Sequence, residues 1–126
     1  MQALGRQILV EFYDCDPDVL KDRDAIDAAV NEAVKRSNAT VVTSTFHTFS
    51  PFGVSGVVVI AESHVAIHTW PEYGYSAVDI FTCGENIDPW AIHDYLKEVF
   101  RSKNTSSMEL KRGVFKMKGK LKHKVA

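Results

Sequence analysis

Five consecutive apolar residues, Val57 to Ala61, constrain the fold of this chain more than any other stretch. Valine and isoleucine favour extended backbone, so the run predicts a β-strand. Neighbouring side chains of a strand point to opposite faces, and here both sets are apolar, which predicts burial on both sides. A second stretch, Val65 to Trp70, follows after three polar residues. The two stretches predict a hairpin with Glu62, Ser63 and His64 at its turn.

Further strands and two helices are expected around this hairpin. Alternating or β-branched residues predict strands over 6–13, 40–49, 75–82 and, more weakly, 106–112. An apolar stripe at helical spacing predicts a helix over 24–36, and it comprises Ile26, Ala29, Val30, Ala33 and Val34. Asp88 and Pro89 are residue types preferred at a helix start, so a second helix is expected from there to about Ser102.

This order of elements predicts an α+β fold, a two-layer sandwich of a mainly antiparallel sheet with helices on one face. The 126 residues suit a single domain with one core. Two helices can cover only one face of the sheet, whereas Val57 to Ala61 predict burial on both. We therefore expect a homodimer that packs sheet against sheet.

Composition and charge narrow the class of protein. Hydrophobic residues make up 45% of the chain, but no apolar run approaches the length of about 20 residues that a membrane helix needs. The first residues lack the features of a signal peptide, and Cys15 and Cys83 have neither metal-type nor disulfide-type spacing. We expect a reduced, cytoplasmic protein with no membrane partner.

The charges are unevenly distributed. Residues 113–126 carry five lysines and no acid, whereas the rest of the chain has ten basic and sixteen acidic residues. An acidic body argues against nucleic acid as the main partner and would tolerate a cationic ligand. The basic tail is of a kind that can contact nucleic acid or anionic lipid, but a solvated terminus is the simpler interpretation.

Ser63 is the first candidate for chemistry. A serine in a strained turn can attack the preceding carbonyl and convert the amide into an ester, with a neighbouring base or donor such as His68 or Ser55. Removal of the α-proton of Ser63 would then expel the carboxylate of Glu62, and hydrolysis of the resulting dehydroalanine would leave a pyruvoyl group. The alternative is that Ser63 merely forms the turn and Glu62 is a solvated charge.

His68 and Cys83 also have structural and chemical interpretations. Imidazole titrates near neutral pH and suits proton transfer, but a lone histidine on a strand is commonly a packing residue. Cys83 is either a small buried residue or a proton donor, and Cys15 is interpreted as structural. A zinc site built from His47, His64, His68 and Cys83 is a rival hypothesis, although paired ligand motifs are lacking and we expect no metal.

Three segments together resemble a known family. They are Phe49 to Glu72, with its run Gly-Val-Ser-Gly-Val-Val-Val-Ile-Ala-Glu-Ser-His, then Tyr75 to Gly84, and Leu4 to Cys15. The sequence resembles the prokaryotic S-adenosylmethionine decarboxylases, the small pyruvoyl-dependent type. The resemblance covers about residues 4–112 and leaves the lysine tail outside.

The resemblance implies self-cleavage between Glu62 and Ser63 into a β chain, 1–62, and an α chain, 63–126. Ser63 would become the pyruvoyl cofactor, whose carbonyl forms a Schiff base with the substrate amine. His68 matches the proton acceptor of processing, Ser55 the residue that assists the ester stage, and Cys83 the proton donor of catalysis.

The resemblance also implies a substrate site and an assembly. Phe49 matches an aromatic residue that stacks on adenine, and Glu72 matches a carboxylate that binds the ribose hydroxyls. Trp70 is a further aromatic suited to the cationic sulfonium through cation–π attraction. The implied homodimer is an αββα sandwich of processed protomers, with its active sites at the interface.

The expected function is therefore decarboxylation of S-adenosyl-L-methionine, which yields the aminopropyl donor of spermidine biosynthesis. Two alternatives stay open. A pyruvoyl-dependent enzyme of the same family could act on arginine or another amino acid, and a non-catalytic relative could keep the fold as a binding or regulatory subunit.

Overall fold

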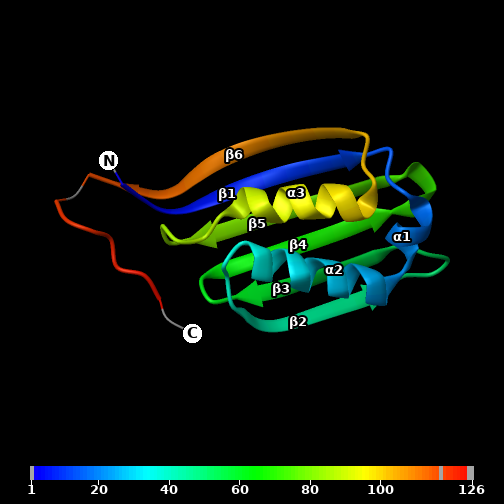
Figure 1. Cartoon of the computed structure of the whole chain (residues 1–126), viewed down its shortest axis with the longest axis horizontal. Helices are drawn as coiled ribbons and strands as arrows, with labels where there is room; N and C mark the ends of the chain where they lie inside the picture. The colour runs from blue at the N-terminus through cyan, green and yellow to red at the C-terminus, as the bar shows by residue number, and fades with distance from the viewer. Residues whose placement is uncertain (1, 117, 125–126) are drawn as a thin grey trace.

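In a computed structural model, residues 2–116 and 118–124 are described, and six strands among them form one antiparallel sheet (Figure 1). The order across the sheet is β2-β3-β4-β5-β1-β6. The strands are β1 (Gln2–Tyr13), β2 (Val41–Thr48), β3 (Val54–Ile60), β4 (Ser63–Trp70), β5 (Tyr75–Cys83) and β6 (Asn104–Phe115). The predicted hairpin of β3 and β4 thus lies inside the sheet, with a neighbour on each side.

The helices cover one face of this sheet, as predicted (Figure 1). They are α1 (Pro17–Lys21), α2 (Arg23–Arg36) and α3 (Pro89–Phe100), and a 3-10 turn, η1 (Pro71–Tyr73), joins β4 to β5. Asp22 caps α2 by accepting a hydrogen bond from the Ala25 N–H, and Asp88 caps α3 by accepting one from the Trp90 N–H. The α+β sandwich is therefore confirmed for one protomer.

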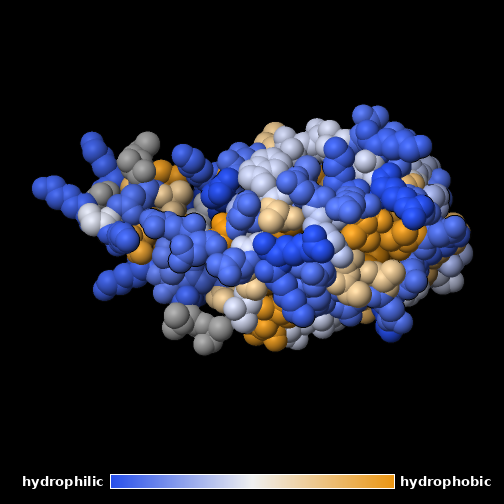
Figure 2. Space-filling view, viewed as in Figure 1, coloured by the Kyte–Doolittle hydropathy of each residue, from blue (hydrophilic) through white to orange (hydrophobic). Residues whose placement is uncertain are grey.

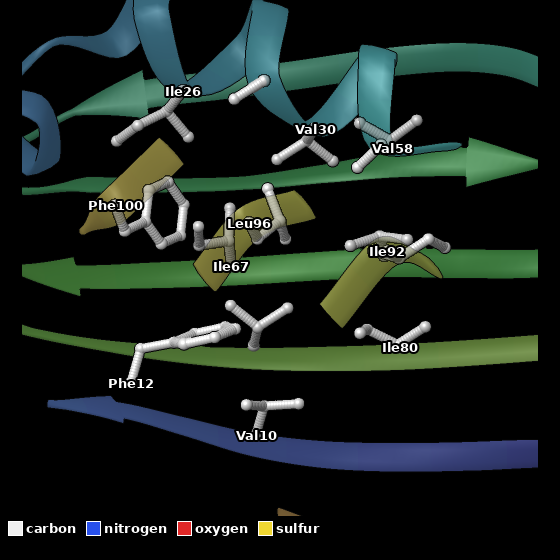
Figure 3. Close-up of a cluster of buried hydrophobic side chains, with 14 of the residues drawn as sticks. Val10, Phe12, Ile26, Val30, Val58, Ile67, Ile80, Ile92, Leu96 and Phe100 are labelled. Atoms are coloured by element: carbon white, nitrogen blue, oxygen red, sulfur yellow. The ribbon is translucent and has the colours of Figure 1, made fainter. Parts of the chain in front are cut away.

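Side chains from both layers form the core between the sheet and the helices (Figure 3). It includes Val10, Phe12, Ile26, Val30, Val58, Ile67, Ile80, Ile92, Leu96 and Phe100. The five residues of the predicted stripe on α2 are all buried. In β1 the predicted alternation also holds, because Ile8 is fully buried whereas Leu9 remains 39% exposed.

The opposite face of the sheet is open in the single chain. Val58 and Ile60 are buried against the helices, but Val59 is 37% exposed on the other side. Leu9, Trp70, Met108 and Leu110 are further exposed apolar residues of the strands. Burial of β3 on both faces is therefore not achieved within one protomer, and the expected dimer stays a prediction.

Two elements differ from the predictions. α1 is not among the predicted helices, because its five residues are too few to show a helical period. β6 runs from Asn104 to Phe115, well beyond the expected 106–112, and pairs with β1 along its whole length. Most of its residues are exposed because it is an edge strand, so its apolar alternation is weak.

Beyond β6, residues 118–124 return toward the sheet. Figure 1 shows them, coloured orange to red, running from beside the N-terminal end of β1 toward the β3–β4 turn. Hydrophilic side chains dominate this end of the molecule (Figure 2). None of the described helices is long and apolar enough to cross a membrane.

Candidate active site

The turn between β3 and β4 is tight and strained. Ile60 is paired with Ser63, so only Ala61 and Glu62 connect the strands. Two-residue hairpins normally place positive φ angles on the two connecting residues. Here the positive φ, 137°, falls instead on Ser63, the residue that follows them. A non-glycine residue in this region is destabilised by about 1–3 kcal/mol, so the backbone strain lies at the predicted cleavage site.

Ser63 contacts Cys83 at the end of β5. The Ser63 Oγ and the Cys83 Sγ lie 3.4 Å apart, and both residues are half-buried. The register pairs His64 with Phe81, which brings the start of β4 beside the end of β5, where Cys83 lies. The sequence predicted each residue separately, and the fold brings the hydroxyl and the thiol together.

Gly5 makes room for this contact and was not among the predicted site residues. It is paired with Cys83 across β1 and β5. A Cβ atom at this position would lie 2.8 Å from the Cys83 Sγ and 2.6 Å from the Phe81 ring. Both distances are below the closest contacts of real Cβ atoms, so only glycine fits without displacing the thiol.

Two adjoining cavities lie at this end of the sheet. One, of about 400 Å³, is lined by Ser63, Cys83, Phe81 and Leu4, and also by residues 122–124 of the C-terminal segment. The other, of about 650 Å³, shares Glu62 and Cys83 with it. The scissile turn therefore borders space in which a small molecule can bind.

Ser55 and His68 form a second group on the open face. They are paired across β3 and β4, and the Ser55 Oγ lies 2.8 Å from the His68 Nδ1. When Nδ1 carries the proton and donates it to this hydroxyl, the Nε2 atom of His68 is left as a proton acceptor. The hydroxyl thus fixes the orientation of the ring.

The predicted substrate residues lie beside this second group. Trp70 follows on β4, with its ring centroid 6.4 Å from that of His68. Glu72 is exposed in η1, and Phe49 is half-exposed just after β2. Tyr75, not predicted as a site residue, stacks on Trp70 at 5.3 Å.

Tyr75 is also bound to an acid on the same face. Its hydroxyl donates a hydrogen bond of 2.6 Å to the Glu11 Oε2. Burial, together with this carboxylate, raises the pKa of Tyr75 well above its ordinary value. The phenol therefore stays protonated and acts as a donor. No sequence motif marked this pair, because its members are 64 residues apart.

The two groups lie at opposite ends of β4. Ser63 opens the strand and His68 is five residues further on, a separation of about 16 Å at roughly 3.3 Å per residue. His68 therefore cannot reach Ser63 of the same chain. The structure brings Ser63 to Cys83 and His68 to Ser55, but it does not unite the two pairs within one protomer.

The remaining cysteine and the zinc hypothesis can be judged from the same geometry. Burial raises the pKa of the Cys15 thiol from 9.0 to about 11, in keeping with a structural residue. Within residues 2–116 and 118–124, no group of three or more His, Cys, Asp or Glu side chains is arranged to hold a metal ion. The four proposed zinc ligands thus do not gather at one place.

Comparison with known proteins identifies the family. The family model described as S-adenosylmethionine decarboxylase matches residues 6–113. The chain belongs to this family. It is 54% identical over 125 residues to an S-adenosylmethionine decarboxylase proenzyme of Acidithiobacillus ferrooxidans, covering 99% of this chain and 94% of the relative. A proenzyme of the same name from Thermotoga maritima is 53% identical over 113 residues, covering 90% and 87%.

A solved structure of the family has the same fold. The crystal structure of the adenosylmethionine decarboxylase from Aquifex aeolicus superposes with a TM-score of 0.88. It is 33% identical in sequence, and the match covers 96% of this chain and all of that one. The resemblance inferred from the sequence is therefore confirmed. The family match ends at Gly113, before the lysine tail.

Proposed function

We propose that this protein is a precursor that cleaves itself between Glu62 and Ser63 and then decarboxylates S-adenosyl-L-methionine. The observation that carries the proposal is the φ of 137° at Ser63, which directly follows a two-residue turn and contacts Cys83. The relatives of this chain are named S-adenosylmethionine decarboxylase proenzymes, which supports both the self-cleavage and the decarboxylation.

The strained turn favours the cleavage chemistry. The Ser63 Oγ attacks the carbonyl carbon of Glu62, and the C–N bond of the peptide breaks to give an ester. A base then removes the α-proton of Ser63, and the ester bond breaks. The leaving group is the main-chain carboxylate of Glu62, which becomes the C-terminus of the β chain. Breaking the chain at this point also removes the constraint that holds Ser63 at a positive φ. Part of the strain is therefore released as the bond breaks.

The resemblance implies that His68 is the base for this step, and in that role it acts on the Ser63 of a second chain. His68 of the same protomer is about 16 Å away along β4, given a rise of roughly 3.3 Å per residue. A two-fold dimer that packs the open faces together, with the two β4 strands antiparallel, brings the Ser63 end of one protomer to the His68 end of its partner. The exposed apolar residues of the open face support this arrangement.

The surroundings of Ser63 fit the pyruvoyl group that the family implies. A cavity of about 400 Å³ adjoins Ser63, and the thiol of Cys83 lies 3.4 Å from its side-chain oxygen. Such a group supplies an electron sink for decarboxylation. The Cys83 thiol lies beside this position, so it is placed to act as the proton donor to the substrate carbon that has lost its carboxylate.

The same dimer would complete the substrate site. Phe49, Trp70 and Glu72 lie at the His68 end of the sheet, so each site would draw them from the partner of the chain that supplies Ser63. Aromatic faces suit both the adenine and the sulfonium, and a carboxylate suits the ribose hydroxyls. This combination favours a nucleoside sulfonium over arginine.

A direct assay tests the proposed substrate. Purified, fully processed enzyme is incubated with carboxyl-labelled S-adenosylmethionine, arginine or ornithine, and the released carbon dioxide is counted. Release from S-adenosylmethionine alone is expected, and it should be lost in Ser63→Ala. Release from arginine in its place would assign the amino-acid alternative, and the absence of release from a processed chain would favour a non-catalytic relative.

A further inference from the structure

The C-terminal segment, defined here as residues 118–124, is tied to the first described residue of the chain. The Leu121 N–H donates a hydrogen bond of 3.3 Å to the Gln2 Oε1. The side-chain amide of Gln2 donates in turn to the Gly119 carbonyl. Gly119 has a φ of 81°, which suits a glycine at a bend. These contacts direct the segment along the end of the sheet toward the β3–β4 turn (Figure 1).

There His123 binds the residue that carries the scissile carbonyl. The His123 Nδ1 and the Glu62 Oε2 lie 2.8 Å apart, and the imidazole is the donor because a carboxylate can only accept. The Glu62 side chain is only 12% exposed, and that of His123 is 30% exposed. The contact is therefore shielded from solvent on the Glu62 side, where a charge-assisted hydrogen bond is strong.

Glu62 has little other support for its carboxylate. Its second oxygen, Oε1, is buried and has no hydrogen-bond partner among the described residues. A buried, unpaired carboxylate oxygen is costly, and among the described residues the bond from His123 is the one hydrogen bond that this carboxylate receives. The basic residues Arg112, Lys122 and Lys124 line the same cavity and add favourable charge around it.

Fixing this side chain also fixes the peptide that is to break. On the other side of the turn, the Ala61 N–H donates a 2.9 Å hydrogen bond to the Thr40 carbonyl. Glu62 is thus held by its own side chain and by its neighbour's backbone. Attack by the Ser63 Oγ requires one orientation of the Glu62 carbonyl, and small misplacements of reacting atoms slow such steps strongly.

We propose that His123 is a positioning residue for the self-cleavage, holding the Glu62 carboxylate so that its carbonyl faces the Ser63 hydroxyl. The inference rests on the proposed cleavage at this bond. It assigns a role to a segment beyond Gly113, where the family match ends. After cleavage the same contact would join the α chain, which carries His123, to the new C-terminus of the β chain.

The test follows the cleavage rate of freshly synthesised precursors. Each chain is made by cell-free translation, and the conversion to two fragments is timed by gel electrophoresis. His123→Ala is expected to slow cleavage about 10-fold or more, the value of a charge-assisted hydrogen bond. His123→Asn, whose amide nitrogen can take the place of Nδ1, is expected to restore most of the rate. Lys118→Ala, an exposed lysine of the same segment that lines neither cavity, is the matched control and should cleave like the wild type.

Two further variants separate positioning from a general structural effect. In a Glu62→Ala background, adding His123→Ala should change the rate little, because the two residues act through one contact. His123→Asp places a second carboxylate against Glu62 and should cleave more slowly than His123→Ala. If His123→Ala does not fold, His123→Asp is compared with the wild type in its place.

The outcomes distinguish the inference from the function on which it rests. A wild-type precursor that never cleaves would overturn the proposed function itself. If the wild type cleaves, and His123→Ala or His123→Asp cleaves at the same rate, the inference alone is overturned. Failure of His123→Asn to recover the rate, or full additivity with Glu62→Ala, would also remove His123 from the positioning role.

Discussion

Co-expression of Ser63→Ala with His68→Ala tests whether His68 acts across a dimer interface. Each variant alone should stay largely uncleaved, the first because it lacks the nucleophile and the second because it lacks the base. Loss of a general base typically slows a reaction by about 10²–10⁴-fold. In a mixed dimer, the Ser63 of the His68→Ala chain would meet the intact His68 of its partner and cleave.

The size of the effect follows from the geometry and from random pairing. With equal expression, about half of the His68→Ala chains should enter mixed dimers, so about a quarter of all chains should be cleaved. If instead His68 served its own chain, it would have to cross about 16 Å, at roughly 3.3 Å per residue, and mixing would rescue nothing.

The readout is the intact mass of each chain after co-expression, since the two variants differ in mass and can be counted separately. We expect cleavage only in the His68→Ala chain. By random pairing, about half of the copies of that chain should be cleaved. Differently tagged subunits show whether mixed dimers have formed. If mixed dimers are present and both chains stay uncleaved, the reasoning is refuted.

Two further variants and two measurements on Cys15 give the remaining predictions. Cys83→Ala should still cleave but decarboxylate at least about 10²-fold more slowly, as steady-state kinetics normalised to pyruvoyl content would check; normal turnover would remove Cys83 as the donor. Gly5→Ala should cost about 1–3 kcal/mol of unfolding free energy and lower kcat, because its Cβ would lie 2.8 Å from the Cys83 Sγ; unchanged melting and turnover would contradict the packing at Gly5. The raised pKa of Cys15, about 11, keeps its thiol neutral, so at pH 8 iodoacetamide should label Cys83 and spare Cys15 until the protein unfolds. Because the ordinary value is 9.0, the stabilisation linked to Cys15 is complete below pH 9 and is lost as the pH rises toward 11, which urea titrations at several pH values would detect.

Local sequence patterns predicted those parts of the fold that depend on one buried face. Ile8 and Val10 in β1, and Val30 in α2, lie in the core as their spacing predicts. Patterning failed where burial is slight or the element is short. β6 extends to Phe115 without a single buried residue, and α1 contains only Leu20 as a buried side chain.

The site shows a different limit. The chemical type and spacing of Ser63, His68 and Cys83 were sufficient to nominate them, and the resemblance assigned roles that remain proposals. Only the three-dimensional structure reveals that Cys83 lies against Ser63 and that His68 does not. The contact of His123 with Glu62 spans 61 residues of sequence, beyond the reach of any local pattern.

The positive φ of Ser63 also could not be predicted from the sequence. A two-residue hairpin usually contains glycine or asparagine at its connecting positions, whereas this one has Ala61 and Glu62. Neither connecting residue adopts a positive φ, and the following serine does. The absence of turn-forming residues was thus a signal of strain, but its location required the backbone.

The intact mass of the purified wild-type chain under denaturing conditions tests the central claim most directly. Self-cleavage to a pyruvoyl group gains water and loses ammonia, so the two fragments should together weigh about 1 Da more than the precursor. The fragment beginning at residue 63 should resist Edman sequencing. A single uncleaved chain, or fragments that together weigh about 18 Da more and carry a free N-terminal serine, as simple hydrolysis would give, would contradict the account.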